Sequence, residues 1–320
     1  MLGEVAIIAL VILNQFSLIS ADQNRGTFLG QFINNPVSEE SGVVKEDSWS
    51  LYKQNLYLSR LPVLPKKDKA AAEPEVNAVS VFVMDEDTDY PLFDKNSKKQ
   101  MPIASLTKIM TALLVVENGD LEETVTISST AAGVFGSNRG MVAGEKIKLK
   151  ELLGVMIIDS NNTAAYALAE HIGGSEENFV AMMNEKAVLL GLENTKFFNA
   201  HGLDEYGEDN YSSAYEIAQL IDAALNEDII WKYSVMQRAT FYSADKKQRH
   251  IVENTNELLG EMENIYGGKT GYTVSAGECL ALVSKSADDE HKIISVILNA
   301  EDRFVEMKKV VNWVFNVYRW

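Results

Sequence analysis

The pattern of apolar and polar positions changes several times along this chain of 320 residues. Residues 78–84 are apolar except for Ser80 and predict a strand, and a turn-like segment at 85–89 and a second short run at 90–93 complete the pattern of a hairpin. Further along, apolar residues recur at intervals of three and four, which predicts helices. The expected helices span 105–118, 148–158, 162–172, 176–190, 213–226 and 302–318. Strand-like runs return at 238–243, 264–273, 277–285 and 291–299.

Strands therefore stand at both ends of this region, and helices lie between them. This order predicts one α+β domain over residues 75–320, in which strands from the two ends share a sheet.

The first 74 residues have a different character. Residues 5–13 are all apolar, a length that suits the core of a signal peptide better than a membrane span of about 20 residues. No Lys or Arg precedes the run, so an uncleaved membrane anchor and a buried helix are alternative interpretations of residues 1–21. Residues 22–74 hold four of the six prolines and little periodicity, which predicts a linker. We expect an exported protein on the extracytoplasmic face of the membrane, in the cell wall or in the periplasm.

Composition narrows the function classes. Hydrophobic residues make up 46% of the chain, which indicates a globular protein. A formal net charge of −17 argues against a broad nucleic-acid-binding surface. Cys279 is the single cysteine, which excludes an intrachain disulfide, and its apolar neighbours predict a buried residue. The four histidines lack paired-ligand spacing, so neither a metal nor another cofactor is expected.

Residues 105–118 combine helical periodicity with a polar pair. Apolar residues surround most of the expected helix, so a lysine at 108 needs a role for its ammonium group. Ser105 and Lys108 are three residues apart and share a face, and Ser105 stands at the helix start, where negative charge is favoured. Ser105 is therefore a candidate nucleophile and Lys108 its candidate base, provided that burial and a second cation lower the Lys108 pKa.

The serine–lysine spacing alone is a weak signal. It also fits a helix-capping serine beside a surface-reaching lysine. The same spacing occurs at Ser50/Lys53 and Ser243/Lys246, in polar surroundings that we interpret as accidental.

Two further segments strengthen the hypothesis. Ser160-Asn161-Asn162 lies between two expected helices, where a loop can hold a hydroxyl and an amide against a nucleophile. Capping of the next helix is the simpler interpretation of that segment by itself. Lys269-Thr270-Gly271-Tyr272-Thr273 lies on an expected strand and offers a cation, a hydroxyl and bare backbone that a peptide can approach. Alone, it would also suit a strand edge protected by a lysine.

The order S-x-x-K, S-x-N, K-T-G is specific to penicillin-binding proteins and class A β-lactamases. From about Val76 to Tyr318 the chain resembles the low-molecular-mass D-alanyl-D-alanine carboxypeptidases. The resemblance rests on Pro102-Ile103-Ala104-Ser105-Leu106-Thr107-Lys108, Ser160-Asn161-Asn162, Asn199-Ala200-His201-Gly202-Leu203 and Lys269-Thr270-Gly271-Tyr272-Thr273. It implies a five-stranded antiparallel sheet flanked by helices, with an inserted helical lobe and the site between them.

The resemblance also implies roles for the catalytic residues. Ser105 would be the nucleophile and Lys108 its base. Ser160 would relay a proton to the leaving D-alanine, and Asn162 would hold the substrate amide and Lys108. The histidine of Asn199-Ala200-His201-Gly202 is interpreted as structural, and Arg303 as a further charge for the substrate carboxylate.

Four residues of the third motif would bind substrate. Lys269 and Thr270 would hold the terminal carboxylate beside Gly271, and the N–H groups of Ser105 and Tyr272 would form the oxyanion hole. The implied partners are peptidoglycan stem peptides ending in D-Ala-D-Ala and, as covalent inhibitors, β-lactam antibiotics. The N-terminus would provide any membrane attachment.

A β-lactamase and a catalytically silent wall-binding or antibiotic-sensing module are the alternatives. Class A lactamases use a glutamate in a Glu-x-x-x-Asn pattern for deacylation. No glutamate between residues 163 and 268 has an asparagine four residues later, which favours the carboxypeptidase. The intact motif residues argue against a silent module.

Overall fold

The structure is a computed structural model that describes residues 63–68, 70–136, 140–204 and 207–320. The predicted signal peptide or anchor at 1–21 and residues 22–62 of the predicted linker lie outside the described residues. Within the ranges described, no helix has both the length and the apolar character needed to cross a membrane.

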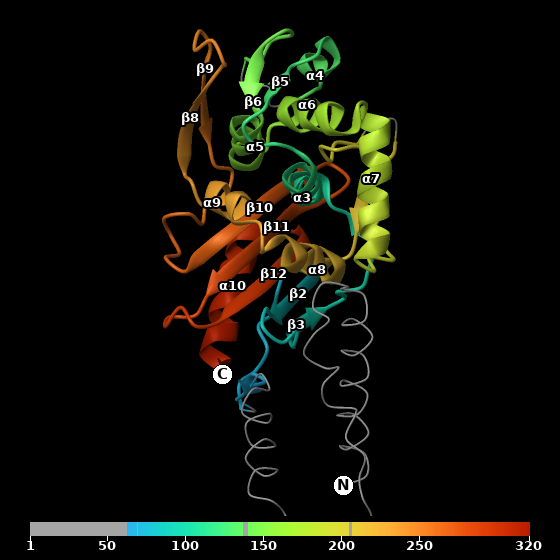
Figure 1. The fold of residues 1–320 in the computed structure, drawn as a ribbon. Coiled ribbons are helices and arrows are strands. Elements are labelled where there is room, and N and C mark those ends of the chain that lie inside the picture. Colours follow the sequence, from blue (N-terminus) through green and yellow to red (C-terminus); the bar gives the residue numbers. More distant parts are fainter. Residues whose placement is uncertain (1–62, 69, 137–139, 205–206) are drawn as a thin grey trace, which may run out of the picture. The chain divides into compact units, whose positions relative to one another are not determined.

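The domain is built on a five-stranded antiparallel sheet with the strand order β10-β11-β12-β2-β3 (Figure 1). The strands are β2 (Ala78–Asp85), β3 (Pro91–Lys95), β10 (Ile265–Thr273), β11 (Gly277–Lys285) and β12 (Lys292–Ala300). Phe82 of β2 lies opposite Val296 of β12, so strands from the two ends of the domain share the sheet. β10 forms one edge.

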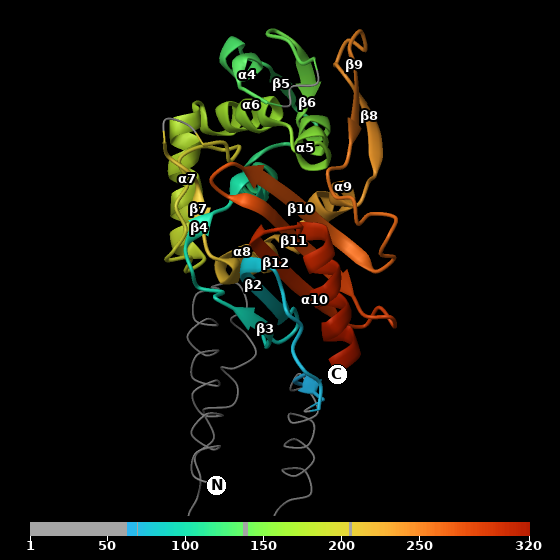
Figure 2. The same ribbon diagram turned by 180° about the vertical axis from the view of Figure 1, so that it is seen from behind.

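Helices cover both faces of the sheet, as the two opposite views show (Figures 1 and 2). α8 (Ala214–Ala224) lies on one face and α10 (Arg303–Val317) on the other. The Asp302 carboxylate accepts hydrogen bonds at 3.0 Å from the N–H groups of Phe304 and Val305 and thereby begins α10. The predicted α+β fold with a five-stranded antiparallel sheet is confirmed.

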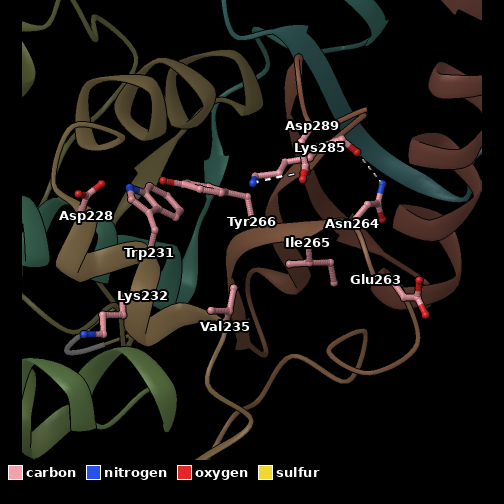
Figure 3. A pocket seen from close by; sticks show the side chains of 10 residues that line it. All are labelled: Asp228, Trp231, Lys232, Val235, Glu263, Asn264, Ile265, Tyr266, Lys285 and Asp289. Atoms are coloured by element: carbon pink, nitrogen blue, oxygen red, sulfur yellow. Dashed lines mark hydrogen bonds and ion pairs between the residues drawn. The ribbon is translucent and has the colours of Figure 1, made fainter. Parts of the chain in front are cut away.

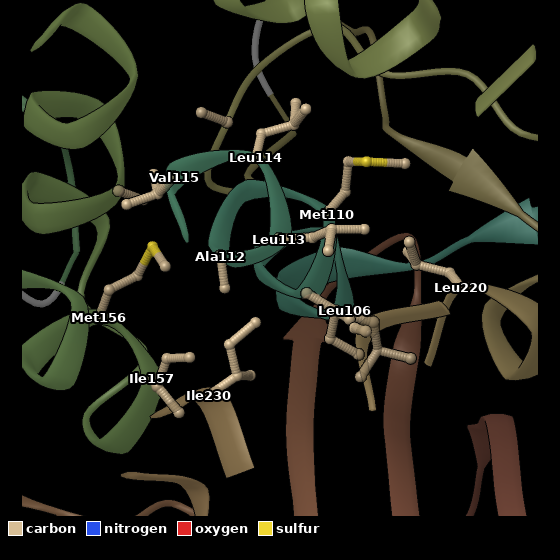
Figure 4. Packing of buried hydrophobic residues seen from close by; sticks show 14 of the residues in the cluster. Leu106, Met110, Ala112, Leu113, Leu114, Val115, Met156, Ile157, Leu220 and Ile230 are labelled. Carbon is tan, nitrogen blue, oxygen red and sulfur yellow. The ribbon is translucent and has the colours of Figure 1, made fainter. Parts of the chain in front are cut away.

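A helical lobe is inserted between β3 and β10. It contains η1 (Ala104–Thr107), α3 (Lys108–Asn118), α4 (Ser129–Gly133), α5 (Leu149–Ile158), α6 (Asn162–Gly173), α7 (Glu176–Leu189) and α9 (Asp228–Ser234). Met156 and Ile157 of α5 and Ile230 of α9 lie around α3 (Figure 4). The first eight residues of α3 are buried, and the Lys108 side chain among them is left only 1% exposed.

Short elements escaped the sequence pattern. They are the helices α4 and α9 and the strands β4 (Met101–Pro102), β5 (Thr124–Thr126), β6 (Lys146–Lys148), β7 (Tyr211–Ser212) and β9 (Arg249–Glu253). β9 pairs with the expected β8 (Arg238–Tyr242). Segments of two to seven residues are too short to show a clear period.

The described end of the predicted linker is attached to the domain. β1 (Lys66–Lys67) pairs with β13 (Tyr318–Arg319), and the Trp313 indole N–H donates to the Ala72 carbonyl at 2.7 Å. Prolines, lysines and alanines make up most of this stretch, so no local pattern predicted the long-range pairing that holds it.

Candidate active site

Ser105 lies in η1, at the entrance to α3. Ala104 before it has a left-handed φ of 46°, a conformation that persists in a non-glycine residue only where its surroundings hold it. The Thr107 hydroxyl donates to the Ala104 carbonyl at 2.7 Å. Gly202 packs on the same carbonyl, so closely that a Cβ at this glycine would overlap the oxygen. The backbone that presents the serine is therefore fixed from two sides.

The Lys108 amine is the centre of a buried polar cluster. Its Nζ lies 2.9 Å from Ser105 Oγ, 2.8 Å from Asn162 Oδ1 and 2.5 Å from the His201 carbonyl. Burial, and then the charge of Lys269, hold the pKa of Lys108 well below its ordinary value. A neutral amine at this distance can accept the serine proton.

Ser160 and Lys269 bring the second and third motifs together. Lys269 Nζ donates to Ser160 Oγ at 2.8 Å and to the Thr270 carbonyl at 3.0 Å. Burial, and then the charge of Arg303, lower the pKa of Lys269 to about 7. Asn161, not Ser160 or Asn162, caps α6, through a hydrogen bond of 2.9 Å from the Ala164 N–H to its side chain. The Ser160 hydroxyl and the Asn162 amide are thereby left to the site.

The edge strand β10 passes directly beside Ser105. A Cβ on Gly271 would stand 3.0 Å from the Ile103 carbonyl oxygen and 3.1 Å from the Ser105 nitrogen, so only glycine allows this approach without displacement. The Tyr272 side chain is 61% exposed. Arg303 Nη1 donates to the Gly271 carbonyl at 2.9 Å, so its guanidinium supports the strand as well as adding charge.

Two contributors to this cluster were not among the predicted catalytic residues. The His201 carbonyl binds Lys108. The His201 ring is buried, and burial, and then the charge of Lys108, lower the pKa of the imidazole to about 3. The Leu203 N–H donates to His201 Nδ1 at 3.1 Å, which fixes a neutral ring. Thr255 Oγ1 lies 2.5 Å from Thr270 Oγ1. Its neighbours form a polar stretch in which no pattern marks one residue.

Other sequence candidates lie apart from this cluster. Ser243 and Lys246 occupy the turn between β8 and β9, and Ser50 and Lys53 lie outside the described residues. Cys279 is buried in β11, as expected, and burial raises the pKa of its thiol to about 11.

The pocket in Figure 3 is also separate. It has a volume of about 510 Å³ and lies at the start of β10, lined by Trp231 and Tyr266 among others. None of the three motifs contributes a side chain to it.

Comparisons with known proteins agree with the geometry. The model of peptidase family S11, described as D-alanyl-D-alanine carboxypeptidase, matches residues 67–302. The D-alanyl-D-alanine carboxypeptidase DacF of Bacillus subtilis (strain 168) is 36% identical over 258 residues, which cover 78% of this chain and 65% of the relative. DacC of Escherichia coli (strain K12) is 32% identical over 266 residues, covering 78% and 64%. The chain thus matches slightly less than two thirds of the length of these relatives.

Solved structures share the fold. The Streptomyces K15 DD-transpeptidase has a TM-score of 0.72 and 26% identity, covering 77% of this chain and all of that one. A D-alanyl-D-alanine carboxypeptidase from Mycobacterium tuberculosis H37Rv has a TM-score of 0.73 at 24% identity, covering 79% of this chain and 96% of that one. With its motifs assembled on this fold, the chain belongs to the D-alanyl-D-alanine carboxypeptidase family of serine peptidases, family S11.

Proposed function

We propose that this protein is a penicillin-sensitive serine carboxypeptidase that removes the terminal D-Ala from peptidoglycan stem peptides. The observation that carries the proposal is the position of a buried amine with a lowered pKa, 2.9 Å from the hydroxyl of Ser105. A serine hydroxyl is a weak nucleophile until a base takes its proton. Membership of the family indicates the substrate class.

Acylation would begin with Ser105 Oγ attacking the carbonyl carbon between the two D-alanines. The hydroxyl proton passes to Lys108 Nζ, and the carbonyl oxygen becomes an oxyanion. The N–H groups of Ser105 and Tyr272 stabilise this charge, because Gly271 brings the backbone of β10 against that of the serine. Each donor of this kind contributes roughly 3 kcal/mol to the transition state.

Collapse of the intermediate would break the C–N bond and release D-alanine. Its nitrogen needs a proton, which Ser160 would supply. The proton that Lys108 took from Ser105 would then replace it on Ser160, which returns Lys108 to its neutral form, while the hydrogen bond from Lys269 holds the Ser160 hydroxyl in place. Asn162 bonds Lys108 through Oδ1, and its Nδ2 donates to the Phe135 carbonyl at 3.0 Å. The asparagine would therefore keep the base in place and would lie beside the substrate amide.

Lys269, Thr270 and Arg303 would recognise the terminal carboxylate. Lys269 and Thr270 are only 5% and 4% exposed, so the carboxylate would bind where water competes little. The anion would in turn favour the protonated form of Lys269, whose pKa of about 7 leaves it partly neutral in the free protein at neutral pH.

Water then hydrolyses the Ser105 ester and completes the cycle. No Glu-x-x-x-Asn pattern stands between the second and third motifs, so Lys108 or Ser160 would activate this water. D-alanine leaves the site after acylation and makes room for this water, whereas the nitrogen released from a β-lactam stays bonded to the acyl group and would crowd the ester, so penicillin would remain attached. This difference separates the proposal from a β-lactamase.

We also infer export of the protein, because the apolar run at residues 5–13 matches the core of a signal peptide or anchor. The proposed location is the extracytoplasmic face of the membrane, the wall or the periplasm, where stem peptides and β-lactams meet the enzyme.

The test is release of D-alanine from an N-acylated peptide that ends in D-Ala-D-Ala. The wild-type protein should release it, and Ser105→Ala should not. Ser243→Ala is the matched control, because Ser243 also stands three residues before a lysine; this variant should keep the activity. Release by Ser105→Ala, or no release by the wild type, would refute the proposal.

A further inference from the structure

The hydroxyl of Thr270 has a partner outside the three motifs. Thr255, in the segment between β9 and β10, places its Oγ1 2.5 Å from Thr270 Oγ1. The Thr270 side chain is buried and that of Thr255 is half-buried. The two hydroxyls therefore form a pair on the wall that also carries Lys269.

The backbone around Thr255 is held firmly. Its N–H donates to the Ile158 carbonyl, at the end of α5, at 3.3 Å. The Asn254 side-chain amide donates to the Ser234 carbonyl, at the end of α9, at 2.9 Å. The Asn256 N–H donates to Asn254 Oδ1 at 2.9 Å. Since α5 leads directly to Ser160, Thr255 joins β10 to the wall that bears the second motif.

The chemistry of a hydroxyl decides the direction of the bond between the threonines. Each hydroxyl has one proton to donate, and an ionised carboxylate can only accept. When a substrate carboxylate binds at Thr270, the Thr270 proton must point to it. The oxygen of Thr270 is then free to accept from Thr255, and a chain of this kind strengthens each of its bonds.

The geometry points to Thr255 as a positioning residue for carboxylate recognition: it donates to Thr270 Oγ1 and so directs the Thr270 proton toward the terminal carboxylate of the ligand. This inference rests on the proposed function, which assigns that carboxylate to Thr270. Thr255 would therefore act by orienting the Thr270 hydroxyl and would not contact the ligand itself.

The test compares acylation by benzylpenicillin, which carries a carboxylate, with acylation by its methyl ester, which does not. Thr255→Val should slow acylation by benzylpenicillin by about tenfold, the loss expected for one hydrogen bond in a charge-assisted chain. Acylation by the ester should change by less than about twofold, because no anion is recognised. Thr255→Ser keeps the hydroxyl and should restore the rate. Thr240→Val, at an exposed threonine of β8, is the matched control.

A double mutant tests whether Thr255 acts through Thr270. Thr255→Val should slow acylation no further in a Thr270→Val background, because the hydroxyl that it orients is gone. An equal loss with both compounds, an additive loss in the double mutant, or an unchanged rate in a folded Thr255→Val protein would each overturn the inference while the proposed function stands. A wild-type protein that neither compound acylates would refute both.

Discussion

Replacement of Gly202 by alanine is expected to displace the nucleophile without removing any group of the site. Gly202 has a φ of +84°, and an added Cβ would overlap the Ala104 carbonyl oxygen and stand 2.9 Å from Thr107 Oγ1. Ala104 is the residue before Ser105, and its carbonyl accepts the Thr107 hydroxyl bond. The backbone at the serine must therefore move to admit the methyl group.

Two terms set the expected loss of stability. A left-handed φ costs an alanine about 1–2 kcal/mol relative to glycine, and overpacking a filled site costs about 1–3 kcal/mol. Their sum, roughly 2–5 kcal/mol, should lower the melting temperature by about 2–4 °C for each kcal/mol in a domain of this size. A shift of about 1 Å in the nucleophile costs roughly 100-fold in rate, so penicillin acylation should slow by that order.

Gly191→Ala separates the two terms. Gly191 has a similar φ of +72°, and a Cβ there would have nothing within 4 Å. This variant should lose only the backbone term and acylate at the wild-type rate. The measurements are thermal melting and the rate of labelling by fluorescent penicillin, made well below the melting temperature of each protein. Equal melting temperatures for the two variants, with unchanged labelling in both, would refute the claim that Gly202 fixes the serine.

Two more changes follow from the structure. Lys269→Met should move the acidic limb of the acylation–pH profile to higher pH. The Lys269 charge lowers the pKa of Lys108, so without it Lys108 stays protonated, and inactive as a base, up to a higher pH. Lys285→Met is the control, and an acidic limb that stays in place or moves to lower pH would contradict the coupling of the two lysines. A chain that begins at Glu75 should still be labelled by penicillin but should melt at a lower temperature than one that begins at Val63. The shorter chain lacks the β1–β13 pairing and the hydrogen bond from Trp313 to Ala72. Equal melting temperatures would show that this attachment adds no stability.

The sheet and the longest helix were predictable because their signals are local. Strands such as β11 and β12 are mostly apolar, and α10 repeats its apolar positions over four turns. Ser105 and Lys108 were predictable for a similar reason, since a spacing of three residues places both side chains on one helical face. An ammonium on an apolar helix also indicated that the lysine would need partners.

The remaining part of the site could not be predicted from local pattern. Lys108 binds the carbonyl of His201. The segment that contains His201 is part of the resemblance, but every residue type offers a carbonyl, so the sequence does not show that this one binds the lysine. Thr255 reaches Thr270 only through the packing of its segment between α5 and α9. The attachment of β1 likewise depends on the opposite end of the domain, which short-range periodicity does not report.

The most direct test of Ser105 as the nucleophile of a carboxypeptidase is the mass of the protein after reaction with benzylpenicillin. We predict one covalent adduct, on the peptide that contains Ser105, that persists for minutes or longer and is absent in Ser105→Ala. An adduct on another residue, or no adduct, would contradict Ser105 as the nucleophile. Loss of the adduct within seconds would contradict the carboxypeptidase and favour a β-lactamase.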